Sequence, residues 1–260
     1  MTDTPSSVSE GSITALRKSS ERLRFVVEPM DDQQLVRQAY PQLWTIADVL
    51  SHIGSGSIIM RERFERSLAG DALPDDFAPG VWDEWNAKSP RAKADDAVAA
   101  DLSLLNRLAA TTSEQRSSLH FPLGPLDLDF GGFVGLRLNE HVLHTWDVAV
   151  VDDPAAALPP DATEIVIDNL ELIARFTGKP TGHELTIVIA TTAPGRQFLV
   201  TLTPETVAMS VGDGTAPSDL VVPAEAFVRL VYGRLDAQHT PEFEGDASLL
   251  DELRRVFPGP

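Results

Sequence analysis

The chain has 260 residues, 43% of them hydrophobic, which is enough for one large domain or two ordinary ones with a buried core. Its formal net charge is −18, from 21 basic and 39 acidic residues, and a surface this acidic repels nucleic-acid backbones and anionic lipids. Because the chain has no cysteine, it can form no disulfide, thiolate metal site or cysteine nucleophile, and any thiol it uses must come from outside.

The N-terminus has no basic patch followed by an apolar run, so it does not resemble a signal peptide. No apolar run in the chain approaches the length of a membrane span. We therefore expect a flexible lead over residues 1–10 and a cytoplasmic protein that binds neither nucleic acid nor membranes.

The next part of the chain, residues 11–150, predicts a four-helix bundle. Thr45 is a candidate N-cap with an acid three residues later, Asp48, which is typical of a helix start. The proline-rich run 70–85 predicts a long loop, in which Trp82 and Trp85 either line a pocket or fasten the loop to the body. Apolar residues recur at helical spacing in four segments, at about 13–28, 45–69, 91–111 and 132–150.

Residues 151–163 contain three prolines and break the helical periodicity, so we predict a linker there. The remaining residues, 164–260, predict a small mixed α/β domain with an antiparallel sheet, and the whole chain is therefore of the α+β class. The elements expected in it are a helix at 165–176, three strand-like runs separated by turn signals, a short strand leading to a helix that begins at Pro223, and a last helix at 247–256.

The stretch NEHVLHTWD places Glu140 and His144 four residues apart, so both side chains project from the same side of one helix, about 6 Å apart along its axis. That helix is apolar on nearly every side, which predicts that it is buried. Because a buried carboxylate needs a cation beside it, we expect one at Glu140. This cation is a metal ion, Arg137 or a histidine. Alternatively, Glu140 and His144 form a simple pair on the helix surface.

His52 lies on the second predicted helix, beside its apolar stripe. Alone, it is explained equally well as an ordinary core histidine. Bundle cores bring inward side chains of different helices together, however, and His52, Glu140 and His144 would make a set of two nitrogens and one oxygen that suits zinc with positions left open. We expect His141, about 100° around the helix from Glu140, to be a flank residue.

Two groups of residues stand in a particular order and separation, Trp44, Asp48 and His52, and then Arg137, Glu140, His144, Trp146 and Asp147. A later segment reads SDLVVPAEAFVRLVYGR. Together they resemble one known family over about residues 10–257, the mycothiol-dependent maleylpyruvate isomerases, and the later segment is similar to part of that family's small C-terminal domain.

The resemblance implies a DinB-like bundle in which His52, Glu140 and His144 hold a divalent metal, commonly zinc, with mycothiol or a similar low-molecular-weight thiol as the second cofactor. A metal-bound thiolate would add to an electrophilic small molecule and so catalyse cis–trans isomerisation. Arg234 is a candidate for binding a substrate carboxylate, although it also fits an exposed arginine at a helix end. Asp147 either orients an imidazole or anchors the end of its helix.

Two other functions fit the same residues. One is a mycothiol S-transferase acting in detoxification, in which the thiol stays attached to the product. The other is a non-catalytic protein that binds a metal or a small molecule. The sequence does not distinguish a monomer from a homodimer.

Overall fold

The structure is a computed structural model, and it describes residues 5–123 and 126–259. The chain forms two compact units that divide between Asp153 and Pro154, and each is described by itself. None of the described helices is both long and apolar enough to cross a membrane.

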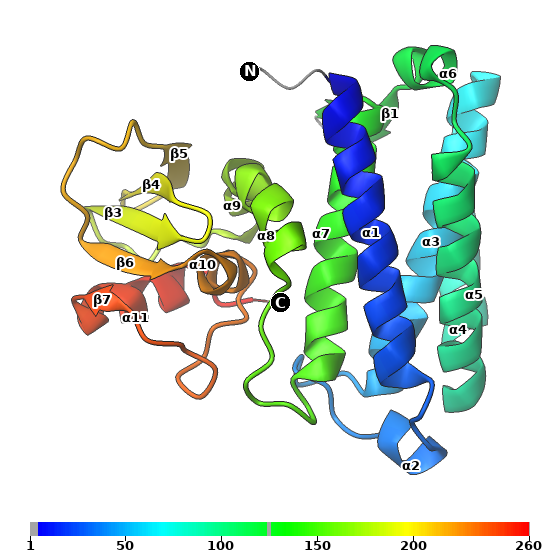
Figure 1. Cartoon of the computed structure of the whole chain (residues 1–260), viewed down its shortest axis with the longest axis horizontal. Helices are drawn as coiled ribbons and strands as arrows, with labels where there is room; N and C mark the ends of the chain where they lie inside the picture. Colours follow the sequence, from blue (N-terminus) through cyan, green and yellow to red (C-terminus); the bar gives the residue numbers. More distant parts are fainter. Residues whose placement is uncertain (1–4, 124–125, 260) are drawn as a thin grey trace. The chain divides into compact units, whose positions relative to one another are not determined.

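The first unit is built on four long helices that run side by side (Figure 1). Both α1 and α3 pack against α5 and α7, so the four helices enclose one core. The helical N-terminal part of the α+β prediction is confirmed, although α1 already includes residues 5–10 of the expected flexible lead, and residues 1–4 lie outside the described residues. The four helices are α1 (Pro5–Val27), α3 (Ile46–Ala69), α5 (Pro90–Ala109) and α7 (Phe130–Ala149).

The expected loop at 70–85 contains a helix, which corrects the prediction. Pro79 falls in the first turn of this helix, where a missing N–H costs nothing because no intrahelical partner exists for it. Trp85, only 3% exposed, fixes the other end against α3. The short elements of the unit are α2 (Asp32–Leu35), α4 (Phe77–Asn86), α6 (Ser113–Ser118), β1 (Phe121–Leu123) and β2 (Leu126–Leu128), the last two forming an antiparallel hairpin.

Helix α3 starts and stops as its sequence predicts. The Thr45 side chain accepts a hydrogen bond from the backbone N–H of Asp48, and the Asp48 carboxylate accepts one from the backbone N–H of Thr45. Gly70 ends the helix at a φ of 76°. Asp48 also pairs with Lys93 at 2.9 Å, which fastens the start of α5 to the start of α3. The start of α3 is therefore a well-anchored part of the bundle.

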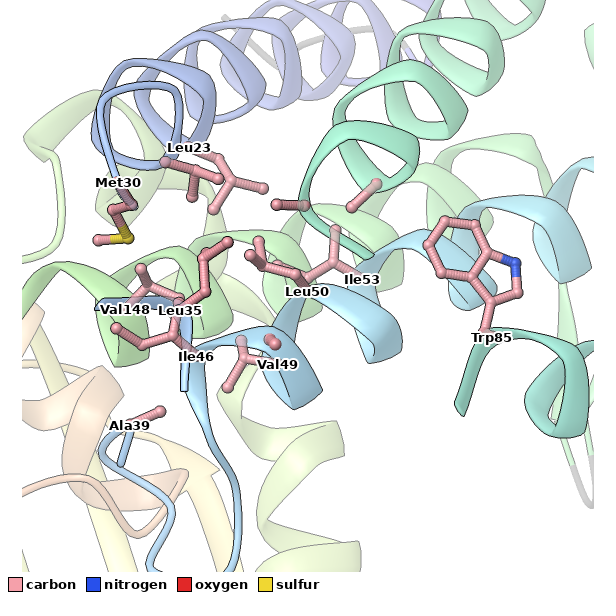
Figure 2. Packing of buried hydrophobic residues seen from close by; sticks show 14 of the residues in the cluster. Leu23, Met30, Leu35, Ala39, Ile46, Val49, Leu50, Ile53, Trp85 and Val148 are labelled. Atoms are coloured by element: carbon pink, nitrogen blue, oxygen red, sulfur yellow. The ribbon is translucent and has the colours of Figure 1, made fainter. Parts of the chain in front are cut away.

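The apolar core at this end of the bundle draws side chains from several helices. Figure 2 shows Leu23 of α1, Leu50 and Ile53 of α3, and Val148 of α7 in one cluster. All four are at most 1% exposed. The helix segments that contribute functional side chains at this end therefore stand on a close-packed base.

The second unit is a five-stranded sheet with helices, in the strand order β5-β4-β3-β6-β7. Three of its four strand pairs are antiparallel, as predicted, but β6 pairs with β3 in parallel. Strands β3, β4 and β5 follow one another in the sheet, and the chain then crosses back so that β6 lies on the other side of β3. No local sequence signal specifies this crossover. The strands are β3 (Leu185–Thr192), β4 (Arg196–Leu202), β5 (Val207–Val211), β6 (Leu220–Pro223) and β7 (Glu244–Gly245).

The helices of this unit differ from prediction mainly at their boundaries. The helix expected at 165–176 is two α-helices joined by a 3₁₀ turn, and it begins at Pro160, inside the expected linker. Pro223 ends β6, and the following helix begins one residue later. The elements are α8 (Pro160–Val166), η1 (Ile167–Asn169), α9 (Leu170–Thr177), α10 (Ala224–Val231) and α11 (Ala247–Val256).

Candidate metal centre

The three residues expected to bind a metal, one on α3 and two on α7, come together in the first unit. His52 Nε2 lies 3.2 Å from Glu140 Oε2, and His144 Nε2 lies 3.5 Å from the same oxygen. One ligand atom from each residue can be chosen so that all three lie within 4.8 Å of one another. Within residues 5–123 and 126–259 this is the one such cluster of histidine and carboxylate side chains.

These distances suit a small divalent cation. Zinc binds nitrogen and oxygen at about 2.0–2.2 Å with tetrahedral angles, which places neighbouring ligand atoms about 3.4 Å apart. The two measured separations, 3.2 and 3.5 Å, lie on either side of that value. The donor set of two imidazoles and one carboxylate is also one that zinc sites use. The residues therefore fit the ion without a rearrangement of the helices.

The cluster is open on one side, which corrects the expectation that Glu140 is buried. The side chains of His52 and Glu140 are 41% and 48% exposed, while that of His144 is 9% exposed. Along α7, Leu136 and Glu140 form the one stripe that is not buried after residue 132 and before Ala149. A ligand from solution can therefore reach the position between the three side chains.

The two histidines control the charge of Glu140. Desolvation raises the pKa of this carboxyl group, but hydrogen bonds and charge from His144 and then His52 outweigh it, so the pKa is well below the ordinary value. Glu140 is therefore ionised at neutral pH, as a metal ligand must be. Arg137, the alternative cation, instead pairs with Asp101 at 3.1 Å, so that alternative is wrong.

Asp147 lies directly behind His144. Its Oδ2 is 2.8 Å from His144 Nδ1, and its side chain is fully buried. Because a carboxylate accepts, Nδ1 carries a proton directed at Asp147, and Nε2 is the ring nitrogen that faces Glu140. The backbone carbonyl of Asp147 also accepts a hydrogen bond from the N–H of Tyr40, which holds the preceding loop against α7.

Trp44 covers one side of both imidazoles. Its ring centroid is 5.2 Å from that of His52 and 5.8 Å from that of His144, with the second pair nearly parallel at 24°. The two imidazole centroids are 4.5 Å apart. Trp44 is therefore an aromatic neighbour of both histidines of the cluster.

The other predicted residues have different surroundings. Arg234 belongs to the second unit, where it is only 6% exposed and donates from Nη1 to the carbonyl of Tyr232 at 2.8 Å. The alternative of an exposed helix-end arginine is therefore wrong. Trp85 fastens α4 to α3, whereas Trp82 is 50% exposed.

His141 is not the flank residue that its angle from Glu140 predicts. It is fully buried, with Nε2 3.0 Å from Asp101 Oδ2 and Nδ1 2.8 Å from Ser19 Oγ. The signal that could have found it is Arg137, four residues earlier on the same apolar helix, since two basic residues on a buried stripe require an acid on another helix. Asp101, on α5, is that acid.

Comparison with known proteins gives a consistent result. Residues 16–149 match the family model described as the mycothiol maleylpyruvate isomerase N-terminal domain. Two solved structures have the same fold, a mycothiol-dependent maleylpyruvate isomerase and a histidine-to-alanine mutant of such an enzyme. Their TM-scores are 0.63 and 0.64, each with 13% identity over 89% of this chain and 95% of theirs. No curated protein matches the chain.

Proposed function

The chain belongs to the family of the mycothiol maleylpyruvate isomerase N-terminal domain, and from this premise we propose that it is a metal-dependent enzyme that uses mycothiol to isomerise a small electrophilic acid. In this proposal His52, Glu140 and His144 hold one divalent cation, with zinc the best fit to their nitrogen and oxygen donors. The cation, when bound, favours the thiolate form of a thiol that coordinates it.

The observation that carries the proposal is the arrangement around His144. A buried carboxylate at 2.8 Å accepts a hydrogen bond from Nδ1 of the imidazole and so holds Nε2 facing Glu140. This carboxylate–histidine pair is the arrangement that metal sites use to orient a ligand and to raise its basicity. The pair supports a metal-binding role because the other ring nitrogen of His144 belongs to the three-residue cluster.

The residues of this chain then have distinct tasks. His52, Glu140 and His144 form one side of the site, Asp147 orients His144, and Trp44 excludes water from the faces of both imidazoles. The open side at Glu140 and His52 admits the thiol and the electrophile. Because the chain has no cysteine, the attacking sulfur is supplied by the thiol cofactor.

The isomerisation needs no net redox change. A bound thiol cofactor would supply a nucleophile that adds reversibly to an activated double bond, which would allow rotation about that bond before the nucleophile is expelled again. The thiol would not be consumed. We propose that Arg234 binds the substrate carboxylate, because a guanidinium can donate two parallel hydrogen bonds to the two oxygens of a carboxylate.

Metal analysis of the purified protein and of a His144→Ala variant tests the proposal. We expect about one equivalent of a divalent metal in the wild type and much less in the variant. Equal metal content in both proteins would remove the basis of the proposal.

The reaction type needs a separate experiment. The zinc-loaded protein is incubated with mycothiol and maleylpyruvate, and the products are followed by mass spectrometry. We expect a change of isomer without a change of mass, and no turnover when the thiol is omitted. A lasting thiol adduct would indicate an S-transferase instead.

A further inference from the structure

A buried polar network crosses the first unit and is not used by the proposed chemistry. Asp101 of α5 faces two residues of α7, with Oδ1 3.1 Å from Arg137 Nη2 and Oδ2 3.0 Å from His141 Nε2. All three residues are at most 3% exposed. Buried ion pairs of this kind add little stability over an apolar core, because desolvation offsets their attraction. Because the network adds little stability, we look for another role for it.

The network also reaches the other two long helices. Arg137 Nη2 donates to the carbonyl of Ile53 at 3.0 Å and to Ser57 Oγ at 2.6 Å, both on α3. His141 Nδ1 lies 2.8 Å from Ser19 Oγ on α1. One connected set of side chains therefore ties α1, α3, α5 and α7 together.

The ties are made at residues adjacent to the candidate metal ligands. Ile53, whose carbonyl receives the hydrogen bond from Arg137, directly follows His52 on α3. On α7, Glu140 lies between Arg137 and His141 in sequence. The network therefore joins the two ligand-bearing helices beside the ligands on each.

Glycine makes the close approach possible. A Cβ added at Gly56, on α3, would lie 3.1 Å from Arg137 Nη1. A side chain at this position would require the guanidinium to shift by a few tenths of an ångström. Gly56 and Arg137 thus fit one another across the two helices.

The rotation of α7 about its own axis determines where its metal-binding side chains lie. Ligand side chains project about 5 Å from a helix axis, so a rotation of only about 3° moves them by about 0.2–0.3 Å. That is the tolerance of about 0.2 Å on metal–ligand distances. A device that fixes the rotation of α7 against α3 would therefore control how well His52, Glu140 and His144 can share one cation.

We propose that Asp101 and Arg137 are a positioning pair that sets the rotation of α7 against α3 and thereby the affinity of the His52–Glu140–His144 cluster for a divalent cation. Neither residue touches the cation. This inference rests on the proposed function, since it assumes that the cluster binds a metal.

The test is a double variant, Asp101→Asn with Arg137→Met, which removes the two charges of the pair together, so that neither is left without the other. Zn²⁺ affinity is measured by competition with a chromophoric chelator, Co²⁺ absorption reports the coordination geometry, and urea unfolding of the metal-free protein reports stability. We expect Zn²⁺ affinity to fall by about tenfold or more and the Co²⁺ bands to change.

Leu105→Ala is the matched control, because Leu105 is on the same helix, is 1% exposed and forms no part of the network. It should lower stability but leave Zn²⁺ affinity unchanged. Wild-type affinity in the double variant, or an equal loss in both variants, would overturn the positioning role. Absence of Zn²⁺ binding by the wild type would overturn the proposed function and this inference with it.

Gly56→Ala provides a second route if the double variant does not fold. The added methyl group pushes the guanidinium away from α3 without removing a charge. We expect a folded protein with weaker Zn²⁺ binding and altered Co²⁺ bands. Unchanged affinity in this variant would overturn the inference as well.

Discussion

Asp147→Asn is the most direct perturbation of the proposed metal centre that leaves all three ligands in place. Asparagine has nearly the shape of aspartate, so the change removes a charge from the fully buried group that lies 2.8 Å from His144 Nδ1. The neutral amide is a weaker acceptor than a carboxylate. If the amide group instead turns its NH₂ toward Nδ1, the imidazole must place its proton on Nε2, the atom that faces Glu140.

Loss of such a partner behind a ligating histidine typically weakens metal binding by about 10–100-fold, or about 1.4–2.8 kcal/mol. We expect Asp147→Asn to fall in this range because the contact is short, charged and shielded from water. Zn²⁺ affinity is measured by competition with a chromophoric chelator at pH 7, and circular dichroism checks that the variant is folded.

A matched control exists in the second unit. Asp236 and His239 are also three residues apart, with Oδ1 2.9 Å from Nδ1, and they belong to no candidate ligand cluster. Asp236→Asn should therefore leave Zn²⁺ affinity unchanged. Undiminished affinity in Asp147→Asn, or an equal loss in the control, would refute the idea that Asp147 acts through His144.

Three further predictions concern stability. In Gly54→Ala the new Cβ would lie 2.1 Å from the ring of Trp85, so we expect a loss of about 1–3 kcal/mol in urea unfolding, and none in Gly80→Ala, where nothing lies within 4 Å. Thr45→Ala should cost about 1 kcal/mol by removing the N-cap of α3, and an unchanged melting temperature would contradict the capping role. Glu252 has a pKa lowered to about 2, because a hydrogen bond from the Thr181 hydroxyl and then the charge and hydrogen bonds of neighbouring basic groups outweigh desolvation. Its contribution is present above pH 4.5 and is lost as the pH falls toward 2, so Glu252→Gln should flatten the stability curve in that window, and an unaltered slope would count against it.

Most of the helices of this protein, and which residues form its histidine and carboxylate cluster, could be predicted from the sequence. The limits of α3 follow from the cap at Thr45 and from Gly70, and α11 has the predicted bounds because its apolar spacing is regular. The short-range pattern also placed Glu140 and His144 on one side of a helix. These features depend on neighbours within a few residues, which a sequence displays directly.

Features that depend on contacts between residues far apart in the sequence were harder to predict. The helix at Phe77–Asn86 is stabilised by the packing of Trp85 against Gly54, 31 positions away, so its prolines alone were misleading. The parallel partnership of β6 with β3 likewise depends on where the chain crosses the sheet. The first was mispredicted and the second was not predicted, because in each case the deciding contact lies far away in sequence.

The sequence by itself determined which donors the chain can offer, since it supplies two histidines and a carboxylate at suitable positions and no cysteine thiol. Only the tertiary structure decided what surrounds them, because the packing of α7 leaves Glu140 open to solvent and directs Arg137 and His141 inward to Asp101. A side chain's spacing along a helix specifies its angle around the axis, but the neighbouring helices determine what lies at that angle.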